Sequence, residues 1–309
     1  MRDREIALHV SDPAFLRRQG GFLRSHLLAD LAPSARPSLE METVAWAAVA
    51  GLGPAVFSRP VERLYLGNEL CPHLGWSDEE ILSACELAAD SGLLFSLVFG
   101  VIRERGFSGR LSLLHQVIGR FGAVEVVASD WGVLSVLDEV GALPVAGRLL
   151  FRAKRLPRLS RSVLPDSLDP GVAASEVSKE QLTELAECPW DIPWEREAAA
   201  RMGVRRADVE MVPQGLRTGT DGLPLSLYLP FTAVTGGGNC PVSVLSVRDG
   251  RTVCSRRCRS SIVLPRFPVR TWSLVQVGQT VFMPTHSLMG HYLANERIDR
   301  LVVEPGLPM

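Results

Sequence analysis

Long apolar segments are missing from this chain of 309 residues. The longest candidates, residues 44–57 and 92–102, are interrupted by glycine or fall short of the roughly 20 residues that a helix needs to cross a bilayer. Residues 2–5 alternate basic and acidic side chains, and no apolar region of signal-peptide length follows them. We therefore expect no membrane span and a cytoplasmic location, where thiols stay reduced.

The chain also has little net charge and few lysines. The formal net charge of −1 gives no general reason to expect a nucleic acid partner. Lys154 and Lys179 are the only lysines among the 33 basic residues, which we attribute to coding bias before mechanism. The arginine- and proline-rich residues 152–169 are expected to form an exposed connection. Phosphate contacts are the alternative there, but the stretch lacks interleaved aromatic side chains.

The common hydrolytic motifs are missing too. The sequence has no G-x-S-x-G elbow and no H-E-x-x-H zinc helix. His286 and His291 are five residues apart, which is not the spacing of a helical ligand pair. His286 either faces a pocket or is a satisfied surface histidine. These absences leave little support for nucleophilic or zinc-dependent hydrolysis.

A regular alternation of strand-like and helix-like segments begins near residue 43. Strands are predicted at residues 44–49, 63–66, 93–101, 124–128, 143–146, 204–211, 225–234, 243–247, 280–283 and 300–304. Ser77 and Glu80 have the spacing of a capping box at the start of one intervening helix. This rhythm predicts a parallel sheet with crossover helices. Units of about 25 to 35 residues leave room for about eight, which favours a TIM-barrel-like (β/α) barrel over an open sheet.

Residues 1–42 do not follow this alternation. Residues 15–31 have a helical pattern, and residues 32–38 form a proline-containing loop sequence. We therefore expect an N-terminal helical extension over residues 1–42, packed on or tethered to an α/β barrel domain over residues 43–309.

Four of the six cysteines give the strongest functional signal. Cys254 and Cys258 form a C-x-x-x-C pair among polar and charged residues. Cys240 lies fourteen residues upstream of the pair, after a run of glycines, and Cys71 follows the predicted strand 63–66. Three clustered thiols plus one distant thiol suit a four-coordinate metal site closed by tertiary folding.

The spacing and surroundings favour an iron–sulfur cluster over zinc. Zinc sites in small domains usually use C-x-x-C pairs, and no third cysteine follows the pair as a radical-SAM motif would require. Arg256, Arg257 and Arg259 favour thiolates by lowering the pKa of nearby thiols. The alternative is that these cysteines are small buried apolar residues. Cys85 is expected in the core, and Cys188 is expected to pack or to serve as a reserve ligand.

Four chemically specialised residues come directly after predicted strands: Cys71, Asp130, Arg148 and Cys240. In a barrel, such positions converge on the carboxyl-terminal rim, where active sites are built. Asp130 can act as an acid or base, or as the N-cap of the next helix. Arg148 can bind a substrate carboxylate or form a structural ion pair. Glu69 and Glu210 are weaker candidates of the same kind.

Several segments resemble the U-thirty-two peptidase-like family, and most closely its ubiquinone-biosynthesis, UbiV-like branch. Residues 64–71 (LYLGNELC) are similar to the segment that carries the first cluster cysteine. Residues 126–134 (VVASDWGVL) resemble the family's N-D-x-G-V-L strand and turn, and residues 146–150 (AGRLL) its G-R-x-L strand. Residues 227–240 and 254–258 match the order of the last three ligands, and residues 298–301 fit the closing strand.

The resemblance implies a TIM-barrel-like core with a [4Fe-4S] cluster on Cys71, Cys240, Cys254 and Cys258. It further implies a subunit of an oxygen-independent hydroxylase of an aromatic or related small-molecule scaffold, with prephenate as the oxygen donor. The expected partner is a related, UbiU-like cluster protein. Other members are regarded as collagenase-like peptidases, so a peptidase of this type is the alternative function. A non-catalytic, cluster-bearing partner subunit is a third.

The chain departs from the family pattern around two of the four cysteines. Pro72, His73 and Leu74 stand where a basic tripeptide is expected, and Asn239 stands where an arginine precedes the second ligand. Ser129 replaces the asparagine of the N-D pair. The ligand set survives these changes, whereas the substrate surroundings do not, so the sequence leaves the substrate open.

Overall fold

A computed structural model of the chain describes most of its residues. They are 3–31, 40–51, 59–102, 104–150, 179–236, 240, 247–248, 251–252, 254, 258 and 274–308. The predicted connection at residues 152–169, residues 243–246 of one predicted strand, and the three arginines around Cys258 lie outside the described residues.

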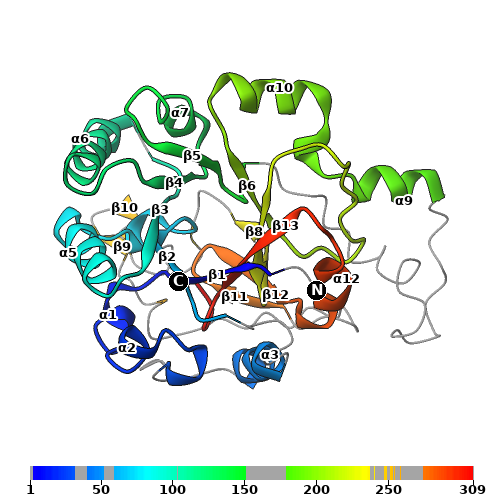
Figure 1. Ribbon diagram of the computed structural model, residues 1–309, viewed down its shortest axis with the longest axis horizontal. Helices are drawn as coiled ribbons and strands as arrows, with labels where there is room; N and C mark the ends of the chain where they lie inside the picture. The colour runs from blue at the N-terminus through cyan, green and yellow to red at the C-terminus, as the bar shows by residue number, and fades with distance from the viewer. Residues whose placement is uncertain are drawn as a thin grey trace.

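Eight parallel strands close into a barrel, which confirms the predicted TIM-barrel-like α/β fold (Figure 1). Around the barrel the order is β1 (Glu5–Val10), β13 (Ile298–Val303), β7 (Leu225–Leu229), β6 (Arg206–Glu210), β5 (Leu143–Ala146), β4 (Glu125–Ala128), β3 (Leu94–Phe99) and β2 (Arg63–Asn68). Strand β1 closes the barrel because it pairs in parallel with both β13 and β2. The carboxyl ends of all eight strands therefore meet at one mouth.

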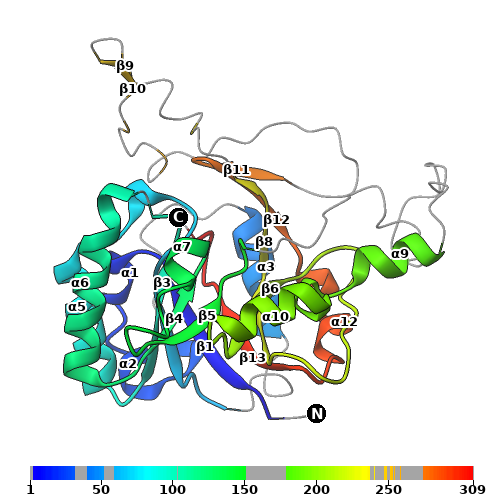
Figure 2. The same ribbon diagram turned by 90° about the horizontal axis from the view of Figure 1, so that it is seen from above.

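Helices pack around the outside of the barrel. They include α5 (Asp78–Asp90), α6 (Glu104–Phe121), α7 (Trp131–Leu134), α10 (Pro193–Arg201) and α12 (Met289–Leu293), whereas α9 (Lys179–Ala186) extends away from the barrel (Figure 2). The predicted capping box of α5 is confirmed, because the Ser77 hydroxyl accepts from the Glu80 N–H while the Glu80 carboxylate accepts from the Ser77 N–H. No helix in the described part of the chain combines the length and the apolar character that a bilayer crossing requires.

The N-terminal segment belongs to the barrel, which corrects the expected domain boundary at residue 42. Within β1, Ile6, Leu8 and Val10 point outward into the main apolar core, while Ala7 packs inside the barrel. The helical pattern at residues 15–31 corresponds to three short pieces: α1 (Pro13–Leu16), α2 (Phe22–Ser25) and a 3-10 turn at Leu28–Asp30. A six-residue strand is buried only by pairing with strands distant in sequence, so local pattern alone gave it no signal.

Two other predicted strands also differ from the structure. The apolar residues 44–49 belong to helix α3 (Glu40–Gly51). The predicted strand 225–234 divides at Pro230, whose peptide bond with Leu229 is cis. After this proline, β8 (Phe231–Gly236) leaves the barrel and joins an antiparallel sheet with β12 (Thr280–Pro284) and β11 (Val275–Val277), which lies over the barrel mouth (Figure 2). A small ribbon of β9 (Val247–Arg248) and β10 (Arg251–Thr252) completes the described strands.

Side chains fill the interior of the barrel. One buried cluster there contains Ala7, Tyr65, Val98, Val127, Val145, Tyr228 and Val302. Near the amino ends of the strands, Arg300 donates to both Glu5 and Glu125. Although burial raises the pKa of Glu125, the hydrogen bonds and charge of Arg300, with the charge of Arg63, hold it at about 2. Satisfied ion pairs thus close this end of the barrel, and the candidate functional residues lie at the other end.

Candidate functional site

Cys71 lies in the loop that follows β2, at the mouth of the barrel. The Asn68 side-chain oxygen accepts hydrogen bonds from the N–H groups of Leu70 and Cys71, at 3.0 and 3.1 Å. A 3-10 turn at Pro72–Leu74 begins at once, with the Leu74 N–H donating to the Cys71 carbonyl. These bonds fix the backbone that carries the thiol, and they explain why a cysteine directly after a strand is well positioned for a site.

The other three cysteines converge on Cys71. Cys258 is buried in the same apolar cluster as Cys71, together with residues of the covering sheet such as Phe231. Cys240 follows β8, and both it and Cys254 are half-buried. The charges of Cys240 and Cys254 raise the pKa of Cys71. The charges of Cys71, Cys240 and Cys254 raise the pKa of Cys258. The four thiols therefore lie within electrostatic reach of one another.

Two thiols of this group, those of Cys71 and Cys258, resist ionisation. Burial raises the pKa of Cys71, backbone hydrogen bonds at His73 and Leu74 lower it, and the charges of the neighbouring thiolates raise it further. Burial and the same neighbours raise the pKa of Cys258. Four thiolates can share this position only if a cation offsets their charge.

The chemistry of this donor set fits a thiolate-bound iron–sulfur cluster or a zinc ion. Within the described residues, however, no three cysteine, histidine, aspartate or glutamate side chains stand in a ready metal-binding arrangement. The fold brings the four thiols within electrostatic reach of one another, and their ligation of a metal stays a prediction.

A buried charged cluster lies beside the cysteines and is centred on Arg148, which is 2% exposed. Its guanidinium contacts Glu69 at 2.5 Å, Glu304 at 2.7 Å and Glu210 at 3.3 Å. It also lies 3.9 Å from the centre of the Tyr228 ring. Burial lowers the pKa of Arg148, but the charges of Glu304 and Glu69 outweigh it and raise that pKa. Of the two alternatives for Arg148, the structure shows the structural ion pair, because carboxylates of the same chain enclose its guanidinium.

Two members of the charged cluster were missed by sequence analysis. Glu304 follows β13, and its Oε1 atom lies 3.2 Å from Nδ1 of His9 on β1. The Nε2 atom of His9 lies 3.1 Å from the Gly67 carbonyl oxygen. The Glu304 Oε2 atom is buried, and no described residue forms a hydrogen bond with it. No local signal marked His9, because its strand is recognisable only from its distant partners, whereas the position of Glu304 at the end of a predicted strand was the signal for that carboxylate.

The charged cluster and the cysteines are directly connected. Glu69 is two residues before Cys71, and its other oxygen accepts from the Ser129 hydroxyl at 2.8 Å. Glu210 accepts from the N–H of Ala233, which packs in the apolar cluster around Cys71 and Cys258. The ion pairs of Arg148 therefore hold the strand ends on which the cysteine site is built.

Asp130 caps a helix, and the two remaining cysteines pack in the apolar core. The Asp130 carboxylate caps α7 by accepting from the Val133 N–H at 3.1 Å, and an acid or base role for it stays a prediction. Cys85 and Cys188 are fully buried in the main apolar core, where burial raises the pKa of each to about 12. The expected packing of Cys85 is what the structure shows, and Cys188 shares no apolar cluster with Cys71.

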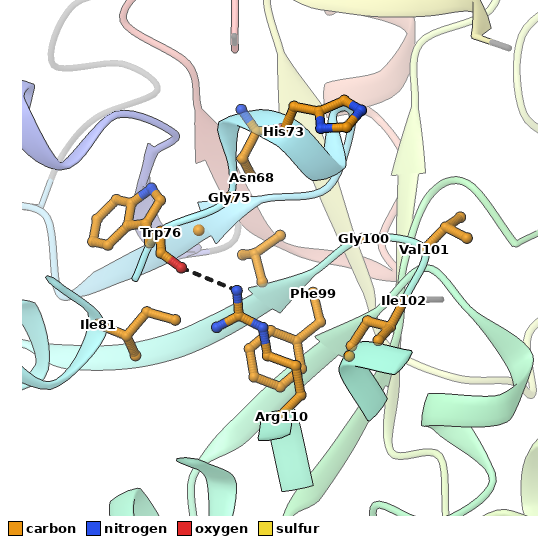
Figure 3. A pocket seen from close by; sticks show the side chains of 13 residues that line it. Asn68, His73, Gly75, Trp76, Ile81, Phe99, Gly100, Val101, Ile102 and Arg110 are labelled. Atoms are coloured by element: carbon orange, nitrogen blue, oxygen red, sulfur yellow. Dashed lines mark hydrogen bonds between the residues drawn. The ribbon is translucent and has the colours of Figure 1, made fainter. Parts of the chain in front are cut away.

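The part of the chain that the structure describes contains cavities large enough for a small molecule. One, of about 380 Å³, lies between the loop after β6 and α12, and none of its described lining residues is next to a cysteine of the site. Another, of about 280 Å³, is lined by Gly67, Asn68 and His73, which flank Cys71 in sequence (Figure 3). Although it is smaller, the second cavity is the one associated with the candidate site.

Comparison with known proteins adds no family assignment. The sequence matches no family model, and no curated protein or solved structure matches it significantly. The fold and the site define the class as a (β/α) barrel whose mouth carries a group of cysteines beside a buried carboxylate–arginine cluster. The family resemblance of the sequence motifs stays a prediction.

Proposed function

We propose that the chain binds a [4Fe-4S] cluster through Cys71, Cys240, Cys254 and Cys258 and acts as a subunit of an oxygen-independent hydroxylase. The observation that supports this proposal is the convergence of four thiols from separate parts of the chain, near enough for their charges to affect one another. They meet at the barrel mouth, the position of active sites in this fold. The C-x-x-x-C pair and the distant fourth cysteine favour an iron–sulfur cluster over a zinc knuckle.

The residues of the chain have positioning roles in this proposal. Asn68 orients the Cys71 backbone, and Arg148 fixes Glu69, two residues before Cys71. The apolar cluster that contains Cys71 and Cys258 limits the access of water, which tunes the properties of a bound cluster. When bound, the cluster supplies electron transfer or activation of the oxygen donor.

The reaction and the partner are carried over from the resemblance of the sequence motifs. The substrate is an aromatic or related small-molecule scaffold, the oxygen donor is prephenate, and the partner is a related, UbiU-like cluster protein. Retention of a second cluster protein during anaerobic purification from the native cell supports the subunit assignment. Hydroxylation by the purified chain alone contradicts that assignment.

Metal analysis of the anaerobically purified chain tests the cluster. We expect about four irons and four sulfides per chain, with broad visible absorbance. A colourless protein with about one zinc would make the site structural and contradict the hydroxylase proposal. Absence of any metal after strictly anaerobic handling, or casein digestion that persists without a cluster, would also contradict it.

A further inference from the structure

The cavity beside the Cys71 loop has mostly apolar walls (Figure 3). It lies between the ends of β2 and β3, with residues of the α5 and α6 helices completing it. Its apolar walls come from Trp76, Ile81, Val98, Phe99, Val101 and Ile102. A volume of about 280 Å³ is near the lower end of the usual range for small-molecule sites, so the cavity suits a ligand with one ring.

Close backbone packing forms one side of this cavity. A Cβ atom on Gly67, where φ is +138°, would lie 2.3 Å from the Val98 carbonyl oxygen, and one on Gly100 would lie 2.5 Å from the Glu69 carbonyl oxygen. The loops after β2 and β3 therefore approach each other as closely as glycine permits. Both glycines line the cavity, so this wall is preformed backbone with no side chain that could fill the space.

The polar groups of the cavity favour an anion. Arg110 and His73 line it, and none of its described lining residues carries a carboxylate. The Arg110 guanidinium donates to the Trp76 carbonyl oxygen at 3.0 Å and lies 5.8 Å from the centre of the Phe99 ring (Figure 3). Asp78 pairs with Arg110 at 3.1 Å, but Asp78 is more than half exposed and lies outside the cavity lining. A solvent-screened pair of this kind leaves the guanidinium able to bind a ligand carboxylate.

Asn68 supplies a second polar contact. It is 7% exposed, it lines the cavity, and its Nδ2 group has no hydrogen-bond partner among the residues that the structure describes. Its Oδ1 atom is already engaged by the Leu70 and Cys71 N–H groups. A buried donor without an acceptor is unfavourable, and an oxygen of a bound ligand would satisfy it. The same side chain would then contact the ligand and hold the backbone of a cysteine of the site.

We propose that this cavity binds a small, single-ring aromatic carboxylate. The ring packs against Trp76 and Phe99, the carboxylate pairs with Arg110, and Asn68 donates to a ligand oxygen. The assignment of this cavity as the substrate pocket of the reaction rests on the proposed hydroxylase function. Its assignment as a binding site for such a ligand rests on the cavity alone.

Calorimetric titration with benzoate, benzamide and acetate tests the binding site. We expect benzoate to bind at least tenfold more tightly than benzamide, which lacks the charge, and than acetate, which lacks the ring. Arg110→Gln should remove the preference for benzoate over benzamide. Arg120→Gln is the matched control, because Arg120 is also on α6, pairs with Glu86 and lies over the Phe121 ring, but is not in the cavity lining.

A variant of Asn68 separates ligand binding from loop positioning. Asn68→Asp keeps an oxygen for the Leu70 and Cys71 N–H groups but replaces the unpaired donor by a charged acceptor. We expect it to retain the wild-type melting temperature within a few degrees and to bind benzoate at least tenfold more weakly. Equal binding of benzoate and benzamide, an unchanged affinity in Arg110→Gln, or no binding of any probe would overturn the proposal.

Parallel iron analysis distinguishes failure of the pocket from failure of the cluster. Benzoate binding by a Cys258→Ser protein that lacks iron supports the pocket and shows that it forms without the cluster. Benzoate binding by wild-type protein that never contains iron supports the pocket and contradicts the proposed function. A protein with four irons that binds no benzoate overturns the pocket and leaves the cluster assignment in place.

Discussion

The stability of the barrel should depend on the protonation of one aspartate. Asp208 is 1% exposed inside the barrel, and its Oδ2 atom accepts from the Tyr228 hydroxyl at 3.0 Å. Its other oxygen is buried and has no hydrogen-bond partner in the described part of the chain. Burial raises the pKa of Asp208 from 3.8 to about 7, and the charge of Glu69 acts in the same direction. Folding therefore favours the neutral carboxyl group.

The direction and size of the pH dependence follow from this pKa. Because the pKa is higher in the folded chain, the contribution to stability is complete below the unfolded value near 3.8 and is lost as the pH rises through about 7. The whole difference corresponds to about 4 kcal/mol, of which about 3 kcal/mol falls between pH 5 and pH 8. Asp208→Asn has the shape of the neutral form and carries no titrating group, so it should lack this loss.

Equilibrium urea unfolding of the two proteins from pH 5 to pH 8 measures the effect. We expect the free energy of unfolding of the wild type to fall by about 3 kcal/mol relative to Asp208→Asn across this range. Asp90→Asn, at the exposed end of α5, is the control and should run parallel to the wild type. Parallel curves for wild type and Asp208→Asn would refute the assignment of a neutral, buried Asp208.

Three further substitutions test how the site is held. Arg148→Met leaves three buried carboxylates without their cation and should lower the free energy of unfolding in urea by about 3–5 kcal/mol; an unchanged value would contradict a central role for the ion pairs. Gly67→Ala places a Cβ 2.3 Å from the Val98 carbonyl oxygen and should lower the melting temperature by several degrees, whereas a wild-type melting temperature would show that the loops can separate. Ser77→Ala removes one half of the α5 capping box and should cost about 1 kcal/mol in the same urea assay, without changing iron content.

Local signals in the sequence were sufficient for much of the barrel. Strands β4 and β5 are short apolar runs bounded by polar or glycine residues, and α5 begins at a complete capping box. Their boundaries were predicted because each depends on neighbouring residues. Strand β1 depends instead on β13, nearly 300 residues away, and this pairing is not visible in the local pattern.

The apolar sequence continues across Pro230, although the chain changes its pairing strand there. Both β7 and β8 are apolar and buried at their junction, so periodicity predicted one strand. In the structure β7 pairs with β6 and β13, whereas β8 pairs with β12 to cover the mouth. Only the arrangement of distant strands decides where the chain leaves the barrel.

The candidate site was predictable as separate residues but not as an arrangement. Arg148 was a candidate because it follows a predicted strand, and Glu69 and Glu210 were weaker candidates of the same kind. In the structure all three lie at or just after the end of a strand, at the same end of the parallel barrel. Glu304 and His9 complete the cluster through contacts that span 156 and 295 residues. The sequence therefore indicated which side chains gather at the mouth, whereas barrel closure determines which of them pair.

Iron and sulfide content in a series of cysteine variants tests the central claim most directly. Serine at Cys71, Cys240, Cys254 or Cys258 should in each case reduce iron and sulfide from about four per chain to a small fraction. Cys85→Ala and Cys188→Ala, which alter the apolar core, should retain the wild-type content wherever circular dichroism shows a folded chain. Full iron and sulfide in any one of the four serine variants would contradict a single cluster held by these four cysteines.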